Sequence, residues 1–230
     1  MESAKEHKMQ TNELIKRYIL FIISLFISAM GVALTKKAEL GVSPISSVSN
    51  LLSLKFEFLS LGNWLIIWNC LLIMGQILLL RKRFKPIQLL QLPLSFLFGF
   101  FTDFCMWLVS FLDVEFYPLR IAFVLIGTVV LALGVALAVI ANVIMNSGEA
   151  FVKAVSDVTH IQFGNVKIVF DIACILTSVI LSLVFFSFTI QGTREGTIIA
   201  AFLTGIVVKL FLKTLSSPME KRLINQKIKL

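Results

Sequence analysis

Six apolar stretches set the strongest limit on how this chain can fold. Most of them approach or exceed the roughly 20 residues that a helix needs to cross the hydrocarbon core of a bilayer. A backbone in lipid must satisfy its own hydrogen bonds, so stretches of this length are predicted to cross as helices. The stretches cover residues 17–35, 64–80, 88–112, 119–145, 165–190 and 196–215.

The composition points the same way. Hydrophobic residues make up 58% of the 230-residue chain and charged residues only 15%, against roughly 25% charged in soluble domains. Lys16 and Arg17 precede the first stretch as they would in a signal peptide, but this stretch is longer than a typical signal-peptide core. We therefore predict an all-α polytopic membrane protein with six spans, the first of them uncleaved.

The basic residues indicate the orientation of these spans. If the N-terminus is inside, 15 Lys and Arg residues fall in inside segments and five fall outside, as the positive-inside rule expects. The net charge of +8 is thereby explained without nucleic acid, and both termini are predicted to be cytoplasmic. A seventh crossing at 43–60 would move the cluster Arg81–Lys85 outside, against the same rule. The inside residues are Lys5, Lys8, Lys16, Arg17, Arg81, Lys82, Arg83, Lys85, Lys153, Lys167, Lys213, Lys221, Arg222, Lys227 and Lys229; the outside residues are Lys36, Lys37, Lys55, Arg120 and Arg194.

An internal repeat relates the two halves of the chain. A shift of 103 residues aligns residues 29–34 with 132–137 and residues 43–46 with 146–149. A shift of 106 residues aligns Phe96–Gly99 with 202–205. Each half has three spans, so the halves would enter the membrane from opposite sides, an inverted-topology repeat common in secondary transporters. The predicted organisation is an N-terminal tail 1–16, repeat 17–112, repeat 113–215 and a basic C-terminal tail 216–230.

Each repeat places a short amphipathic segment after its first span. Ser43 and Pro44 are typical of a helix start, with serine capping and proline at the first helical position, and Asn146 is the corresponding cap in the second half. A helix N-terminus carries free amides and partial positive charge, which suits an anionic group of a solute. The segments 43–60 and 146–163 are compatible with re-entrant helices or with helices in the headgroup layer. The candidate substrate-binding residues are Ser43, Pro44, Ser46, Ser47, Asn50, Asn146, Ser147 and Glu149.

Ionisable residues inside apolar stretches form a second candidate group. Asp103, Asp171 and Lys209 lie within spans, where a charge costs on the order of 2.5–3.5 kcal/mol, so each is expected to face a partner in the interior. Asp103 and Lys209 occupy matched positions in the two halves, and we predict that they pair. An ion or proton relay and a structural ion pair are both open, and Asn69 extends the polar lining.

The chain carries no catalytic or metal-binding pattern. It lacks GxSxG, HExxH and phosphate-loop motifs, and Cys70, Cys105 and Cys174 lie inside spans as apolar free thiols. We expect no enzyme activity, no cofactor and no metal.

Several elements resemble the YczE/YyaS/YitT-type bacterial integral membrane proteins. They are Gly31–Leu34, the stretch Ala38–Pro44 containing LGVSP, Gly62-Asn63, Gly99 with Asp103, Glu195–Thr197 and Gly205. The resemblance covers roughly residues 15–215 and implies a multi-pass protein of the bacterial cytoplasmic membrane. The chain differs from that pattern at Ile45–Ser47 and at Lys209, where an aspartate often stands in those proteins.

Two functions are compatible with these features. The first is a small transporter or permease, or the substrate-binding membrane component of one, for a small polar or anionic solute. The second is a non-transporting scaffold or accessory protein that anchors a cytoplasmic partner through the basic loop Arg81–Lys85 and the basic tail Lys221–Lys229. The expected partners are the lipid bilayer and a solute or partner protein, with a homodimer also compatible.

Overall fold

The computed structural model describes residues 11–223 and contains six helices that are long and apolar enough to cross a membrane. Each of them coincides with one of the six predicted spans. Two helices extend into the predicted tails, because α1 begins at Thr11 and α8 runs to Leu223. The remainder of both tails lies outside the described residues. The long helices are α1 (Thr11–Lys37), α3 (Leu61–Leu80), α4 (Gln91–Leu108), α5 (Tyr117–Ala141), α7 (Phe163–Phe185) and α8 (Glu195–Leu223).

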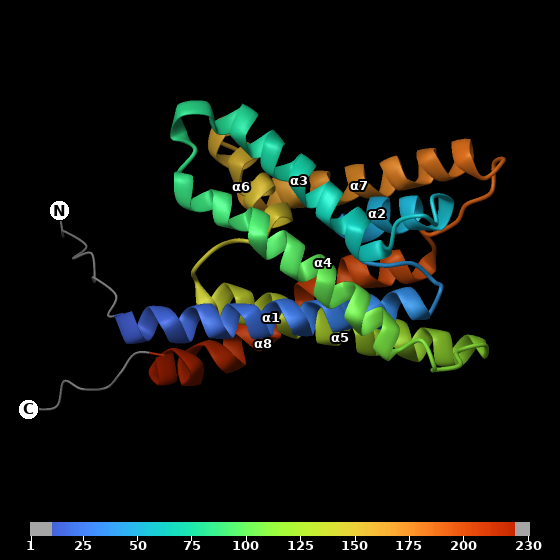
Figure 1. The fold of residues 1–230 in the computed structure, drawn as a ribbon, viewed down its shortest axis with the longest axis horizontal. Helices are drawn as coiled ribbons and strands as arrows, with labels where there is room; N and C mark the ends of the chain where they lie inside the picture. The colour runs from blue at the N-terminus through green and yellow to red at the C-terminus, as the bar shows by residue number, and fades with distance from the viewer. Residues whose placement is uncertain (1–10, 224–230) are drawn as a thin grey trace, which may run out of the picture.

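Two short helices follow α1 and α5. These are α2 (Pro44–Lys55) and α6 (Ser147–Thr159), and two 3-10 turns, η1 (Arg81–Arg83) and η2 (Pro86–Leu90), join α3 to α4. Figure 1 shows that the chain turns back after α1 and after α5 before each short helix begins. The first two thirds of α2, from Pro44 to Leu51, are buried apart from Ile45, which is partly buried. The short helices therefore start inside the helical bundle and run outward.

The α1–α5 contact forms the centre of the bundle. Glycines let the two backbones approach closely, as is common between membrane helices. A Cβ atom placed on Gly31 would lie 2.4 Å from the backbone nitrogen of Leu131, and one on Gly134 would lie 2.6 Å from that of Ser28. We call this contact the α1–α5 seam.

A buried arginine joins the beginning of α1 to the end of α5. Arg17 is paired with Glu13 one turn earlier, with 2.9 Å between Nη2 and Oε1. Its Nη1 also donates to the carbonyl oxygens of Ile140 and Ala141, at 3.3 and 3.2 Å. The last carbonyls of a helix lack intrahelical donors. The Arg17 guanidinium donates to two of these carbonyls at the end of α5, so the role of Arg17 is structural.

The outer helices pack around the seam in a repeating pattern. Helix α4 contacts α1 as α8 contacts α5, and α2 contacts α7 as α3 contacts α6. These pairings are the ones that an inverted repeat would produce, although the repeat itself stays a prediction. Helix α3 packs along α4, whereas their counterparts α7 and α8 are not packed together in the described part of the chain (Figure 1).

Candidate functional site

The start of α2 agrees with the sequence prediction in position but not in capping. The helix begins at Pro44, the predicted first position, with Ser43 at the N-cap. The Ser43 side chain makes no capping hydrogen bond, and its hydroxyl donates to Oγ of Ser46 at 3.1 Å. Asn146, at the N-cap of α6, also makes no side-chain capping bond. The predicted side-chain caps are therefore wrong for both helices.

The polar side of α2 faces the interior. Ser46, Ser47, Ser49 and Asn50 are all buried. Ser47 Oγ lies 2.6 Å from the Pro44 carbonyl and 3.3 Å from that of Cys174, and Ser178 on α7 donates to the Ser47 carbonyl at 3.2 Å. This packing against α7 places the first turns of α2 inside the helical bundle.

The start of α6 is held by amide and hydroxyl groups from α3 and α4. Gln76 Nε2 donates to the Ser147 carbonyl at 3.2 Å and to Gln91 Oε1 at 3.1 Å. The hydroxyls of Ser95 and Ser147 are 3.1 Å apart. All four side chains are buried, so they fix the first turn of α6 at its position in the bundle.

The first turns of α2 and α6 lie against each other. A Cβ atom placed on Gly148 would be 3.0 Å from Cδ1 of Ile45. The glycine therefore permits the two helix starts to approach, one from each half of the chain. Neither start is capped by the side chain of its N-cap residue, and the partial positive ends of both helices lie in the same region.

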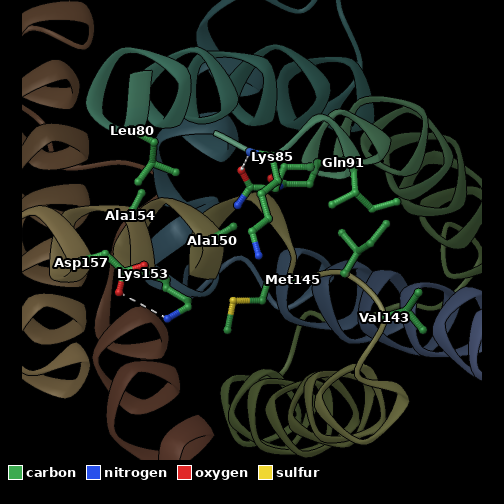
Figure 2. Close-up of a pocket in the computed structure, with 12 residues that line it drawn as sticks. Leu80, Lys85, Gln91, Val143, Met145, Ala150, Lys153, Ala154 and Asp157 are labelled. Carbon is green, nitrogen blue, oxygen red and sulfur yellow. Dashed lines mark hydrogen bonds and ion pairs between the residues drawn. The ribbon is translucent and has the colours of Figure 1, made fainter. Parts of the chain in front are cut away.

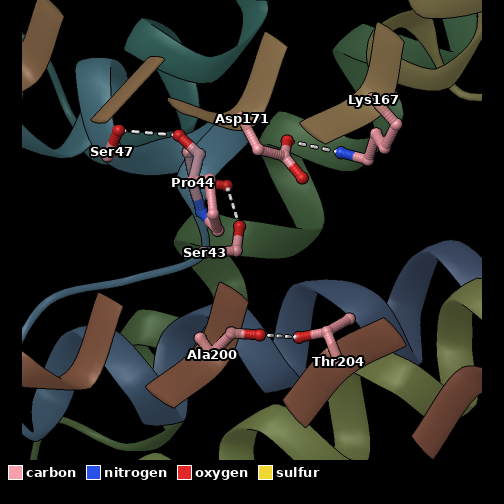
Figure 3. Close-up of polar contacts among 8 residues, drawn as sticks. Ser43, Pro44, Ser47, Lys167, Asp171, Ala200 and Thr204 are labelled. Carbon is pink, nitrogen blue, oxygen red and sulfur yellow. Dashed lines mark hydrogen bonds and ion pairs between the residues drawn. The ribbon is translucent and has the colours of Figure 1, made fainter. Parts of the chain in front are cut away.

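Charged groups lie close to these helix starts. Lys167 Nζ and Asp171 Oδ1, one turn apart on α7, form an ion pair at 2.6 Å. Figure 3 shows this pair on α7 near the Ser43–Pro44 start of α2, with Ala200 and Thr204 of α8 across from it. Burial raises the pKa of the Glu149 carboxyl, Lys167 counteracts that shift and Asp171 adds to it. Glu149, Lys167 and Asp171 thus form one electrostatically coupled group, which we call the charge cluster.

Asp103 and Lys209 do not form the predicted pair. Asp103 accepts hydrogen bonds from Ser60 Oγ at 2.5 Å and from the Gly62 amide at 2.8 Å, near the N-terminus of α3. Lys209 is exposed and has no ion pair among the described residues. The prediction failed because matched positions in the repeat have different surroundings. Asn69 lies partly buried on α3.

A cleft of about 200 Å³ runs along α6 toward its first turn. Figure 2 shows Lys85 and Gln91 on one side, Met145 and Val143 on another, and the Lys153–Asp157 ion pair on the α6 side. Ala150, in the second turn of α6, also lines it. The cleft opens beside η1 and η2, at the end of the bundle that we predict to be cytoplasmic.

Sequence reasoning missed several residues around the helix starts. Lys167 was assigned to an inside loop, although its spacing of four from Asp171 is the signal of a helical ion pair. Gln91, Ser95 and Ser178 were not singled out, because isolated polar residues in spans usually serve helix packing. Within residues 11–223, no group of three His, Cys, Asp or Glu residues is arranged to hold a metal ion.

These features define a multi-pass helical membrane protein with two short helices that start in its interior. The chain belongs to DUF6198, a family of unknown function, whose family model matches residues 15–213. No curated protein and no solved structure matches the chain. The match supplies no support for the YczE/YyaS/YitT-type assignment in particular.

Proposed function

We propose that this protein is a small transporter or permease, or the substrate-binding membrane component of one, for a small polar or anionic solute. The observation that supports this most is the meeting of the α2 and α6 starts beside the charge cluster. Helix starts in the membrane interior are a recurrent way of binding anionic substrate groups. The proposed location is the bacterial cytoplasmic membrane, in line with the YczE/YyaS/YitT-type resemblance, with both termini inside.

The chemistry of the region suits a solute with one anionic group. Two helix N-termini and the Lys167 ammonium attract negative charge, and the hydroxyls of Ser43 and Ser46 offer further hydrogen bonds. With Glu149 protonated, Lys167 and Asp171 balance each other and the helix N-termini leave a net positive potential. With Glu149 ionised, its negative charge offsets the two helix N-termini, and the attraction for an anion is lost. Protonation of Glu149 is therefore expected to favour binding.

A ligand screen tests the binding step. Purified protein is heated with individual small carboxylates, phosphates, sulfate and amino acids, and the melting temperature is recorded. A ligand at 100 times its dissociation constant stabilises by about 2.7 kcal/mol. A stabilising compound should lose its effect with Lys167→Gln and Ser46→Ala, provided that each variant elutes as a single folded species. Arg83→Ala changes an exposed position on η1 and is the matched control, in which the compound should still raise the melting temperature.

Uptake by proteoliposomes tests transport itself. A compound found in the screen should accumulate inside vesicles that contain the protein, and the Lys167→Gln variant should not support this uptake. Binding without uptake would support a substrate-binding component that needs a further subunit. Absence of binding to every compound class would contradict the proposal.

The scaffold alternative draws on one observation. None of the residues of η1 (Arg81–Arg83) is buried, so this loop is available to a cytoplasmic partner. Replacing all three residues by alanine should abolish recovery of a partner protein if the scaffold function holds, and should leave solute binding intact if the transporter function holds. The scaffold function thus predicts that this variant loses its partner protein, whereas the transporter function predicts that it keeps its solute.

A further inference from the structure

One end of the bundle is closed by contacts between two loops. The backbone amide of Gly196 donates to the Leu40 carbonyl at 2.8 Å, and Gly41 forms an isolated antiparallel bridge with Thr193. The fit is tight, since a Cβ atom on Gly41 would lie 2.2 Å from Thr197 Oγ1. We call the contact between residues 40–42 and residues 192–197 the outer latch, because it lies at the end predicted to be outside.

Helix α2 is part of the same closure. Asn50 Nδ2 donates to the Gly192 carbonyl at 2.8 Å, and Lys36 Nζ donates to Asn50 Oδ1 at 2.5 Å. A Cβ atom on Gly192 would lie 3.2 Å from Cδ1 of Leu54 and 3.5 Å from Cα of Leu51. The loop that carries Gly192 therefore covers one side of α2 from Asn50 to Leu54.

The residues equivalent to the outer latch line the open cleft. A shift of 103 residues carries Ser47, Asn50, Leu51 and Leu54 to Ala150, Lys153, Ala154 and Asp157, and carries residues 40–42 to 143–145. A shift of 106 residues carries Thr193, Arg194 and Thr197 to Ile87, Gln88 and Gln91. All of these counterparts line the cleft of about 200 Å³ in Figure 2. Surfaces that touch at the outer end are thus separated at the other end.

The glycines of the outer helices show the same difference between the ends. Gly62 and Gly99 bring α3 and α4 together, since a Cβ atom on Gly62 would lie 2.2 Å from the Gly99 carbonyl oxygen. Their repeat counterparts are Gly164 on α7 and Gly205 on α8, and nothing lies within 4 Å of a Cβ atom on either. Equivalent surfaces are packed in one half and free in the other.

We propose that the structure is the inward-open state of an alternating-access carrier, and that its inner cleft closes in the way the outer latch is closed here. In the opposite state, residues 143–145 contact residues 87–91, and α7 contacts α8 at Gly164 and Gly205. The outer latch then opens and α3 separates from α4. This proposal rests on the proposed transport function, but its test requires no solute.

Paired cysteines in a chain without Cys70, Cys105 and Cys174 test this exchange. The outer pair is Leu54→Cys with Thr193→Cys, and the inner pair is its repeat counterpart, Asp157→Cys with Ile87→Cys. A short bifunctional thiol reagent is added to the full chain in membrane vesicles, and cross-linking is followed over time. If the opposite state is populated at about 1–10%, the inner pair should react roughly 10- to 100-fold more slowly than the outer pair. A chain with all four cysteines should form either cross-link but not both.

Two further measurements make the test decisive. Cross-linking the inner pair should expose Ser46→Cys to an impermeant thiol reagent added from outside, whereas cross-linking the outer pair should protect it. The Cβ atom of Gly205→Leu meets nothing within 4 Å in this structure, and the added side chain should prevent inner cross-linking while the outer pair still reacts. An inner pair that never reacts, or a four-cysteine chain that forms both cross-links together, would overturn the proposal. Either result would leave solute binding, and hence the proposed function, to be judged by the screen alone.

Discussion

The Asp103 carboxylate accepts a hydrogen bond from the backbone amide of Gly62 at 2.8 Å, so a side chain of α4 binds the first turn of α3. Ser60 Oγ donates to the other oxygen of the same carboxylate at 2.5 Å and also accepts from the Asn63 amide. An acidic group at a helix N-terminus is favourable because the helix dipole is positive there. Asp103 therefore serves to fix α3 on α4.

Removing this carboxylate should destabilise the protein independently of Lys209. Asp103→Leu leaves the Gly62 amide and the Ser60 hydroxyl without their acceptor, at an expected cost of about 1.5–3 kcal/mol. Because Asp103 and Lys209 share no contact, the effect of adding Lys209→Met should be additive within about 0.5 kcal/mol. Unfolding of the two single variants and the double variant in detergent measures the cost of Asp103→Leu and the additivity of the two changes. A double variant more stable than Asp103→Leu alone would show that the two residues interact.

The α1–α5 seam should be intolerant of larger residues. Gly31→Ala places a methyl group against the backbone of Leu131, and the overpacking is expected to cost about 1–3 kcal/mol. Gly164→Ala is the matched control, since nothing lies within 4 Å of the added carbon. The melting temperature in detergent should fall for the first variant and stay level or rise for the second. Equal effects would mean that the seam is not closely packed.

Glu149 should make stability depend on pH. Burial raises the pKa of this carboxyl above its ordinary value of 4.5, with Lys167 opposing and Asp171 reinforcing the shift. A raised acid pKa means that folding favours the protonated form, so the contribution of Glu149 to stability falls as pH rises through the folded-state pKa. Glu149→Gln should therefore raise the melting temperature at pH 8 and should lose this advantage as the pH approaches 4.5.

A second acidic residue provides the control for that experiment. Asp157 is half-exposed and pairs with Lys153 on the same helix. An ion pair that faces solvent contributes little to stability. Asp157→Asn should change the melting temperature little at either pH. If the melting temperature of Glu149→Gln varied with pH in the same way as that of the parent protein, Glu149 would not be the source of the pH dependence.

Thiol labelling of intact cells should establish the orientation. Arg83 lies in the basic loop that we predict to be inside, and Arg194 precedes α8 at the predicted outer end. In a cysteine-free background, Arg194→Cys should react with an impermeant reagent from outside and Arg83→Cys should react only after lysis. The reverse pattern would place both termini outside.

The spans and the short helices could be read from the sequence because their signals are local. Apolar length depends only on consecutive residues, and proline at a first helical position predicts the start at Pro44 without knowledge of its neighbours. The ends of α1 and α8 were misjudged because these helices continue past the apolar stretches into polar sequence. Backbone hydrogen bonds favour continuation of a helix into polar sequence, and hydropathy does not report where such a helix ends.

The candidate site was predicted less well because it depends on contacts between distant residues. The serines of α2 were predicted as candidate substrate-binding residues, and no sequence pattern indicated that Ser47 exchanges hydrogen bonds with α7 across more than 120 positions. Symmetry suggested Asp103 with Lys209, but the two ends of the bundle are packed differently. Repeat-matched positions share a place in the topology without sharing neighbours.

The close backbone approach between α1 and α5 also bears on how the protein can be divided. Its contact joins the first helix of one half to the first helix of the other, so the halves adhere through surfaces that do not involve the linking segment, residues 109–116. Two separately synthesised three-span fragments would retain that contact in full. The seam would then hold the two fragments together, and a split gene expressed as two chains should restore the intact assembly.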